Sequence, residues 1–537
     1  MALASPNALE SWWSLQPSLE RGDSVVRCSL FHFCHPPAKG SRAWTGLQPS
    51  LERGDSVVRC SLFHFCHPPA KGSRAWTGLQ PSLERGDSVV RCSLFHFCHP
   101  PAKGSRAWTG LQPSLERGDF VVRCSLFHFC HPPAKGSRAW TGLQPSLERG
   151  DSVVRCSLFH FCHPPAKGSR AWTGLQPSLE RGDSVVRCSL FHFCHPPAKG
   201  SRAWTGLQPS LERGDSVVRC SLFHFCHPPA KGSRAWTVLQ PSLERGDSVV
   251  RCILFHFCHP PAKGSRAWTG LQPSLERGDS VVRCSLFHFC HPPAKGSRAW
   301  TGLQPSLERG DSVVRCSLFH FCHPPAKGSR AWTGLQPSLE RGDSVVRCSL
   351  FHFCHPPAKG SRAWTGLQPS LERGDSVVRC SLFHFCHPPA KGSRAWTGLQ
   401  PSLERGDSVV RCSLFHFCHP PAKGSRAWTG LQPSLERGDS VVRCSLFHFC
   451  HPPAKGSRAW TGLQPSLERG DSVVRCSLFH FCHPPAKGSR AWTGLQPSLE
   501  RGDSVVRCSL FHFCHPPAKG SRAWTGLQAA APIWELV

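Results

Sequence analysis

The eleven residues from Ser24 to Cys34, Ser-Val-Val-Arg-Cys-Ser-Leu-Phe-His-Phe-Cys, decide the fold that this chain is expected to adopt. They are rich in β-branched and aromatic residues and contain neither Gly nor Pro, which is typical of a β-strand. Successive side chains of a strand point to opposite faces. One face then carries Val26, Cys28, Leu30, His32 and Cys34, and the other carries Val25, Arg27, Ser29, Phe31 and Phe33.

The residues on either side of this stretch predict turns and breaks. Before it, Pro17 suits the first position of a helix and Gly22 suits a C-terminal cap, so the pattern is that of one helical turn, which is not stable alone. After it, Pro36-Pro37 ends the strand and residues 38–41 predict a loop. A further short segment surrounds Trp44.

All of these residues belong to a 32-residue unit, LQPSLERGDSVVRCSLFHFCHPPAKGSRAWTG, first seen at residues 15–46. Sixteen near-identical copies fill residues 15–526. Residues 1–14 form an N-terminal flank that resembles a decayed partial copy, and residues 527–537 form a C-terminal tail. The 32 cysteines and 32 histidines of the chain are therefore one pair of each, copied. Any motif in the unit is a single observation, because copying multiplies it without adding information.

Three positions depart from the unit: Phe120 and Ile253 each replace a serine, and Val238 replaces a glycine. None of the changes is conservative, since Phe adds a large ring and Val excludes a positive φ. Natural solenoids have diverged repeats and atypical terminal caps, and the sequence shows neither. The near-identity of the copies indicates recent expansion of a 96-nucleotide tandem repeat with little constraint on each copy.

One strand in every 32 residues fits two architectures. A β-solenoid would stack identical residues about 4.8 Å apart and form ladders of Phe31, Phe33 and Trp44. It would also stack Arg27 on Arg27, at a cost of up to about 1 kcal/mol per neighbour in water, and Pro and Gly add breaks. We therefore expect a mostly irregular, disordered chain with short β-prone segments around residues 25–34 and their copies. A β-solenoid of 32-residue coils is the alternative.

The cysteines and histidines of one unit are of the residue types that bind metal ions. Cys28, His32, Cys34 and His35 form C-x3-H-x-C-H, four residues of the types that bind zinc. On an extended strand Cys28 and Cys34 lie about 20 Å apart, which prevents joint ligation or a disulfide. We therefore predict no metal site and no cofactor. Stacked coils would bring Cys28 and Cys60 within bonding distance, but only in a solenoid under oxidising conditions.

Two binding motifs remain. Arg21-Gly22-Asp23-Ser24 resembles the RGDS sequence of integrin-binding adhesion proteins, and the resemblance covers these four residues alone. The formal net charge of +30 predicts weak, salt-sensitive and sequence-independent binding of nucleic acid. The cations are dispersed along the unit and are not clustered. Exposed β-prone segments also predict self-association or aggregation.

The sequence excludes most enzyme classes. It has no glycine-rich phosphate loop, no G-x-S-x-G and no H-E-x-x-H. The N-terminus lacks the features of a signal peptide, and no apolar run approaches the ~20 residues of a membrane helix, so an intracellular location is the default. We predict no assignable biochemical activity and a chain that is the product of an expanded, minisatellite-type reading frame. The alternative is a repetitive, low-affinity binding protein for metal, for anionic polymers or for cells through RGDS.

Overall fold

The computed structural model describes most of each copy. The described segments are 10–15, 18–34, 42–66, 74–98, 106–130, 138–162, 170–194, 202–226, 234–258, 266–290, 298–322, 330–354, 362–386, 394–418, 426–450, 458–482, 490–496, 498–514, 522–527 and 534–536. Every regular element in these segments is a β-strand. None is a helix with the length and apolar character needed to cross a membrane. The chain divides into two compact units, residues 1–267 with 273–275, and residues 268–272 with 276–537.

Each copy of the repeat forms three strands. In the first copy these are a corner strand β2 (Ser18–Arg21), a long strand β3 (Ser24–Cys34) and a short strand β4 (Arg42–Leu47). Every type recurs with the same length at steps of 32 residues. The recurrences run from β5 (Ser50–Arg53) to β47 (Ser498–Arg501), from β6 (Ser56–Cys66) to β48 (Ser504–Cys514), and from β7 (Arg74–Leu79) to β49 (Arg522–Leu527). The flanks add β1 (Glu10–Leu15) and β50 (Trp534–Leu536).

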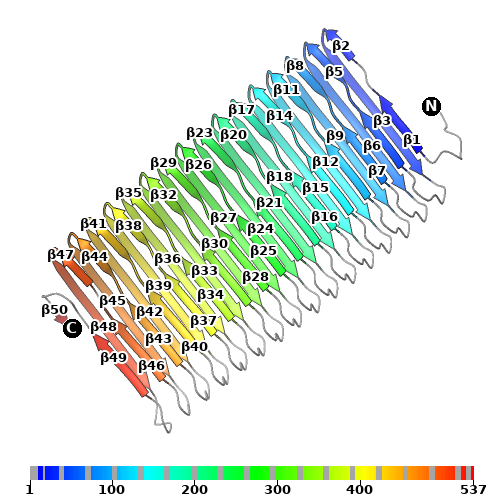
Figure 1. Ribbon diagram of the computed structural model, residues 1–537. Coiled ribbons are helices and arrows are strands. Elements are labelled where there is room, and N and C mark those ends of the chain that lie inside the picture. Colours follow the sequence, from blue (N-terminus) through cyan, green and yellow to red (C-terminus); the bar gives the residue numbers. More distant parts are fainter. Residues whose placement is uncertain are drawn as a thin grey trace. The chain divides into compact units, whose positions relative to one another are not determined.

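Strands of one type pair in parallel, residue for residue, with the same strand of the next copy. Phe31 pairs with Phe63 in the long strands and Leu19 pairs with Leu51 in the corner strands. Each series contains every third strand of the chain. In the first unit, the short strands run from β1 to β22 (Arg234–Leu239), the corner strands from β2 to β23 (Ser242–Arg245) and the long strands from β3 to β24 (Ser248–Cys258). The second contains β28 (Arg298–Leu303) to β49, β29 (Ser306–Arg309) to β47 and β27 (Ser280–Cys290) to β48. Each unit is thus a parallel β-solenoid with 32-residue coils (Figure 1).

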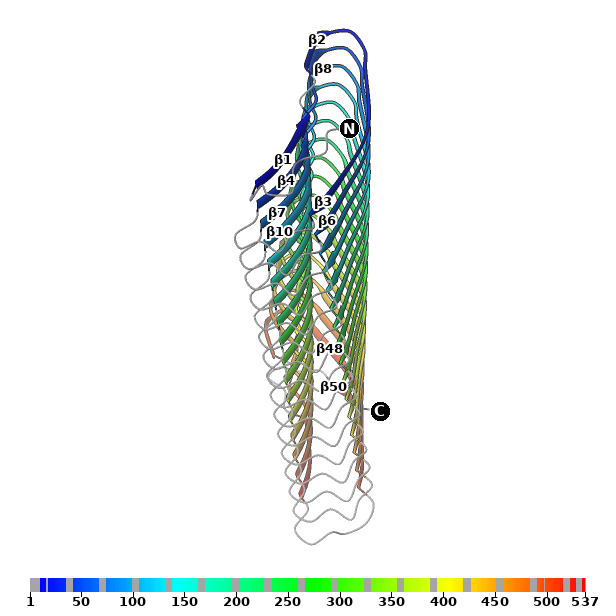
Figure 2. The same cartoon turned by 90° about the vertical axis from the view of Figure 1, so that its right-hand side faces the viewer.

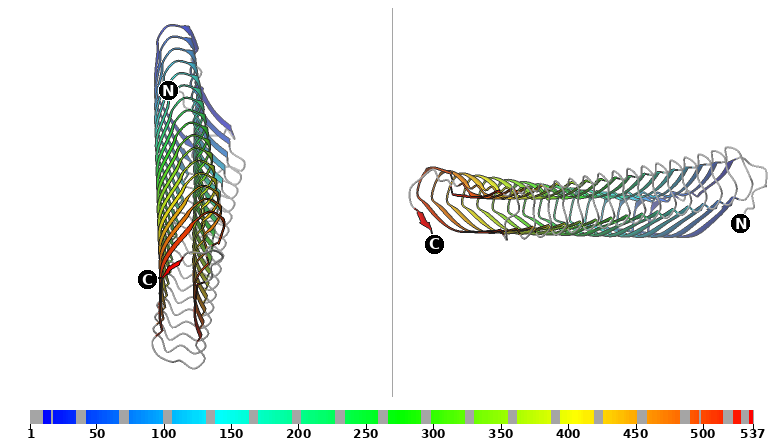
Figure 3. Two further views of the ribbon diagram at one scale, coloured as in Figure 1. Left: turned by 90° about the vertical axis from the view of Figure 1, so that its left-hand side faces the viewer. Right: turned by 90° about the horizontal axis from the view of Figure 1, so that it is seen from below.

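Two layers enclose the core of each unit. The long strands form one layer, and the short and corner strands form the facing layer (Figures 2 and 3). Val90 and Leu94 of the long strand β9 (Ser88–Cys98) are completely buried, as is Leu79 of β7. Burying one such side chain contributes about 1.5–3 kcal/mol. The apolar residues of one coil therefore outweigh the arginine repulsion of about 1 kcal/mol per neighbour that had counted against this fold.

A glycine corner joins each corner strand to its long strand. Gly54 has a φ of 127°, a conformation that residues with a side chain rarely adopt. A Cβ on Gly54 would also overlap the carbonyl oxygen of Gly22 in the preceding coil. The predicted helical turn at Pro17–Gly22 is wrong, because Ser18–Arg21 is a strand and the glycine turns the chain. Pairing with neighbouring coils supplies the hydrogen bonds that one isolated helical turn lacks.

The prediction of a mostly irregular, disordered chain is wrong for the described residues, and the alternative of a β-solenoid is the observed fold. The strand expected at Ser24–Cys34 is confirmed, and so is its alternation. In β6, Val58 and Cys60 point into the core and Arg59 is exposed. Because Arg59 faces water, the high dielectric constant weakens the repulsion between neighbouring arginines. The predicted loop at Pro36-Pro37 and residues 38–41 lies outside the described residues.

Candidate functional site

The outer surface of the long strands is the most strongly patterned part of each unit. We call it the arginine face, and it carries Val25, Arg27, Ser29, Phe31 and the corresponding residues of later copies, with Ile253 in place of one serine, together with the phenylalanines from Phe65 onwards. Arg27 is exposed, and so are its copies Arg59 and Arg91. No long strand contains an Asp or a Glu. The long strands therefore contribute one positive charge per coil to this face and no carboxylate.

The arginines of this face form a row along each solenoid. Arg59 pairs in register with Arg91, and Arg155 with Arg187. Parallel strands place such partners about 4.8 Å apart. Within the described segments, the members of the row from Arg27 to Arg475 form no ion pair with any carboxylate. The row is therefore a closely spaced line of unpaired cations in water.

Two phenylalanine ladders run beside the arginines. The rings of Phe63 and Phe95 stack with centroids 4.8 Å apart and planes 1° apart, and Phe65 stacks on Phe97 at 5.0 Å. In the inner coils each ring face is thus covered by the ring of the neighbouring coil. These rings contribute apolar contact, and the described inner rings offer no free π surface on which a planar ligand could stack.

The inner face of the long strands holds the first cysteine and the first histidine of each copy. Cys60 and its later copies are buried, and so is His96 with its described copies up to His448. The two positions are four residues apart along one strand, a separation of about 13 Å, so they do not converge on one ion. The described residues contain no group of three potential metal ligands. The side chain of Cys34 and the whole of His35 lie outside the description.

Burial disfavours the charged forms of the buried thiols and imidazoles, but at Cys188 hydrogen bonds from Cys156 and Cys220 outweigh it and lower the pKa of that thiol to about 5. Burial raises the pKa of the Cys92 thiol, so this sulfur is a poor nucleophile. Burial and the charge of His352, two coils away, lower the pKa of His416 to about 3. The His96 ring stacks on His128 with centroids 4.8 Å apart, and its Nδ1 lies 3.4 Å from the hydroxyl of Thr77. These groups are packing elements of the core.

The Arg and Asp side chains of the RGDS corner are exposed in every described copy, whereas the serine is buried in inner copies such as Ser56. Arg21 and Asp23 both reach solvent, and the following Arg53-Gly54-Asp55 repeats this arrangement. However, the backbone N–H of Asp55 donates to Oδ1 of Asp23 at 3.1 Å, and the same bond recurs between later coils. Each aspartate therefore uses one carboxylate oxygen to join two coils.

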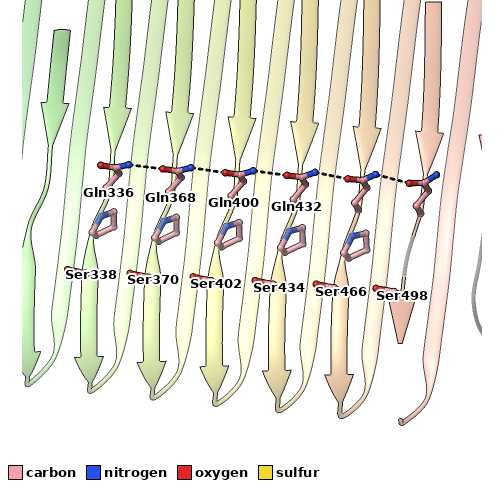
Figure 4. Close-up of a pocket in the computed structure, with 17 residues that line it drawn as sticks. Gln336, Ser338, Gln368, Ser370, Gln400, Ser402, Gln432, Ser434, Ser466 and Ser498 are labelled. Atoms are coloured by element: carbon pink, nitrogen blue, oxygen red, sulfur yellow. Dashed lines mark hydrogen bonds between the residues drawn. The ribbon is translucent and has the colours of Figure 1, made fainter. Parts of the chain in front are cut away.

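A polar groove in the second unit follows the junction between short and corner strands. It has a volume of about 790 Å³ and is lined by Gln336, Pro337, Ser338 and the corresponding residues of later copies up to Ser498 (Figure 4). Nε2 of Gln368 donates to Oε1 of Gln400 at 2.7 Å, and the amides continue this chain in both directions. Much of the polar capacity of the groove therefore serves the contact between coils.

Sequence reasoning missed the glutamine ladder and the arginine row as surfaces. The signal available in the sequence was the constant 32-residue spacing. In a parallel stack of coils, this spacing places each residue beside its own copy and so forms a ladder of identical side chains. The chain was compared with protein-family models, with curated proteins and with solved structures, and none of the three comparisons gave a match.

Proposed function

We propose that the chain is a repetitive binding scaffold and that its arginine face binds linear polyanions. The observation that carries the proposal is the in-register row of exposed arginines without carboxylates, seen for example at Arg155, Arg187 and Arg219. Other exposed arginines are less suited to this role. Arg53, on a corner strand, is preceded by the exposed Glu52 and lies in the same corner as Asp55.

Electrostatics gives such a row a reason to bind. Each arginine repels its neighbour by up to about 1 kcal/mol in water. A chain of phosphates or sulfates along the row replaces this repulsion by attraction and releases the polyanion's condensed counterions. Because the coils are identical, every additional coil contributes the same contact, and the avidity grows with the number of coils engaged.

The geometry of the phenylalanine ladders defines the selectivity of this binding. Single-stranded nucleic acid is usually held by stacking its bases on aromatic rings. The faces of Phe63 and Phe95 are covered by each other and by the next ring on either side. Binding therefore depends on the charge of the polymer backbone, and base sequence has little effect.

Metal binding by cysteine and histidine and cell adhesion through RGDS have less support. Cys60 and His96 are buried on the inner face of the long strands, as are their described later copies, so a metal ion would have to enter a packed core. The RGDS corner is exposed, but the Asp23 carboxylate already accepts the Asp55 amide. Neither limitation applies to the arginine face.

The test compares two charge-matched triple variants. Arg155→Ser, Arg187→Ser and Arg219→Ser remove three neighbours from the arginine face. Arg149→Ser, Arg181→Ser and Arg213→Ser remove the same charge from the corner strands of the same coils. Oligo(dT) and inorganic polyphosphate are titrated at several salt concentrations, and binding is followed by fluorescence anisotropy or calorimetry.

The expected result is an asymmetry between the variants. The face variant weakens binding and reduces the slope of log K against log salt by about 0.7 for each lost phosphate contact. The corner variant changes both quantities much less. Equal losses in the two variants would mean that net charge alone drives binding, and no binding by the parent chain near physiological salt would reject the proposal outright.

A further inference from the structure

The first and the last coils expose apolar side chains that every inner coil covers. Leu19 is 44% exposed, whereas its copy Leu51 in the next coil is 4% exposed. Phe31 in the first coil is 60% exposed. At the other end of the array Val505 and Phe511 are each 41% exposed. The two end coils therefore expose the apolar surface that, inside the array, is covered by the next coil.

The two ends are complementary because all coils have nearly the same sequence. Inside the chain, the Gly22 amide donates to the Arg53 carbonyl of the next coil at 3.0 Å. The series ends when the Gly470 amide donates to the Arg501 carbonyl. Within the described residues, no further coil offers a carbonyl to the Gly502 amide. In a head-to-tail joint, the Arg21 carbonyl in the first coil of a second copy would stand in the acceptor position for the Gly502 amide, as Arg501 does for Gly470.

Strand β1 lies beside β4, where a strand of a preceding copy would have to pair if two copies stacked end to end. It pairs with β4 residue for residue, from Glu10 with Arg42 to Leu15 with Leu47. In a joint between two copies, the short strand β49 of the preceding copy would pair with β4 in that place. The strand β1 therefore competes directly with β49 of another molecule.

Strand β50 occupies the corresponding position at the other end. Its residues Trp534, Glu535 and Leu536 pair in parallel with Val506, Arg507 and Cys508 of β48 (Figure 1). The long strand β3 of a following copy would pair with β48 in the same place. Because β50 covers three residues and a long strand covers eleven, β50 is the weaker partner of β48.

We propose that β1 and β50 are end caps and that they block head-to-tail association between copies of this chain. The apparent absence of caps in the sequence is thereby explained, because each cap is one short strand and not a repeat. Loss of both caps lets the last coil of one molecule stack on the first coil of the next. A heterologous contact of this kind produces linear polymers when its rotation does not close a ring.

The proposal is tested in the full-length chain with proline, which removes a backbone donor and disrupts strand pairing. Trp12→Pro and Glu535→Pro fall inside the two caps. The matched control, Asn7→Pro with Ala530→Pro, falls in the same flanks but outside both strands. Sedimentation velocity and electron microscopy report the size and form of each protein, and circular dichroism reports its strand content.

The parent and the control are expected to remain monomeric, and the double cap variant is expected to form linear polymers whose mean length rises with concentration. A polymeric parent would overturn the proposal. The proposal would also be overturned by a cap variant that retains its strand content and stays monomeric up to the highest concentration at which the control is soluble.

A mixing experiment separates ordered joints from general aggregation. Two further proteins are made from the cap variant. Phe31→Lys places a charge on the first coil and prevents it from accepting a preceding copy, and Phe511→Lys does the same to the last coil for a following copy. Each protein alone should be monomeric, and an equal mixture should yield dimers, since one intact leading end meets one intact trailing end. Large species formed by either protein alone would show aggregation without end specificity and would reject the head-to-tail contact.

Discussion

Val238 tilts the indole of Trp236 out of the tryptophan row. The centroids of Trp204 and Trp236 are 5.5 Å apart and their planes differ by 32°, whereas Trp172 and Trp204 lie 4.8 Å apart with parallel planes. In other copies the ring covers the glycine two residues later. A Cβ on Gly206, for example, would overlap the Trp204 ring. The repeat therefore needs glycine at this position to let tryptophan lie flat on the strand.

Replacing Val238 by Gly should return Trp236 to the stack. A stacked aromatic pair contributes about 0.5–1.5 kcal/mol, but Gly in a strand costs about 0.5–1 kcal/mol in chain entropy. We therefore expect little change in stability and a stronger tryptophan signal in near-ultraviolet circular dichroism. Ile253→Ser, which also restores the repeat but lies on the arginine face, is the control. A spectrum that responds equally to both variants would contradict the explanation.

Replacing Gly214 by Ala should open the stacking locally. Its φ is 132°, and an added Cβ would overlap the carbonyl oxygen of Gly182. Ala at a positive φ destabilises by more than about 1 kcal/mol. Hydrogen exchange of residues 202–226 should therefore accelerate, and Ser221→Ala on the outer face should leave it unchanged. Equal protection in the two variants would show that the corner tolerates a side chain.

Acid should destabilise the solenoid through its buried histidines. Because the folded-state pKa of His416 is about 3 and an unfolded histidine titrates near 6.5, the unfolded chain binds more protons between these values. Stability should therefore be greatest above pH ~6.5 and fall towards pH 3, by about 1.4 kcal/mol per pH unit for each such histidine. Urea unfolding at a series of pH values measures the slope.

A variant separates the histidines from other acid effects. His384→Leu, His416→Leu and His448→Leu remove three stacked imidazoles while keeping apolar volume in the core. The slope of unfolding free energy against pH should decrease relative to the parent between pH 6 and 4. An unchanged slope would assign acid sensitivity to other groups.

The first cysteine of each inner copy should resist alkylation in the folded protein. Cys252 is 4% exposed, and its copy gives a distinct tryptic peptide, CILFHFCHPPAK, because it contains Ile253. Mass spectrometry after treatment with iodoacetamide should find Cys252 unmodified in buffer and modified in urea. Rapid modification in buffer would show that the inner face of the long strand opens readily.

Some of the fold could be read from the residues themselves. The run from Ser24 to Cys34 has the composition and alternation of a half-buried strand, and the structure has this strand with the expected faces. The glycine corner was misassigned because Pro17 and Gly22 also suit a helical turn. The Ser-to-Phe change at Phe120 appeared disruptive, but this position points inward, and the ring is fully buried.

The sequence by itself determined the 32-residue period, the strand at Ser24–Cys34 and the residues that share each of its faces. These follow from local properties, namely composition, alternation and copying. Only the tertiary structure decided that the strands stack, which face is buried, and that Arg27 lies in a row along an outer surface. The reason is that parallel stacking is favoured by burial and hydrogen bonding between residues 32 apart, and it is opposed by repulsion between like charges. Its outcome depends on whether Arg27 faces water or the core, and a single repeat does not contain that information.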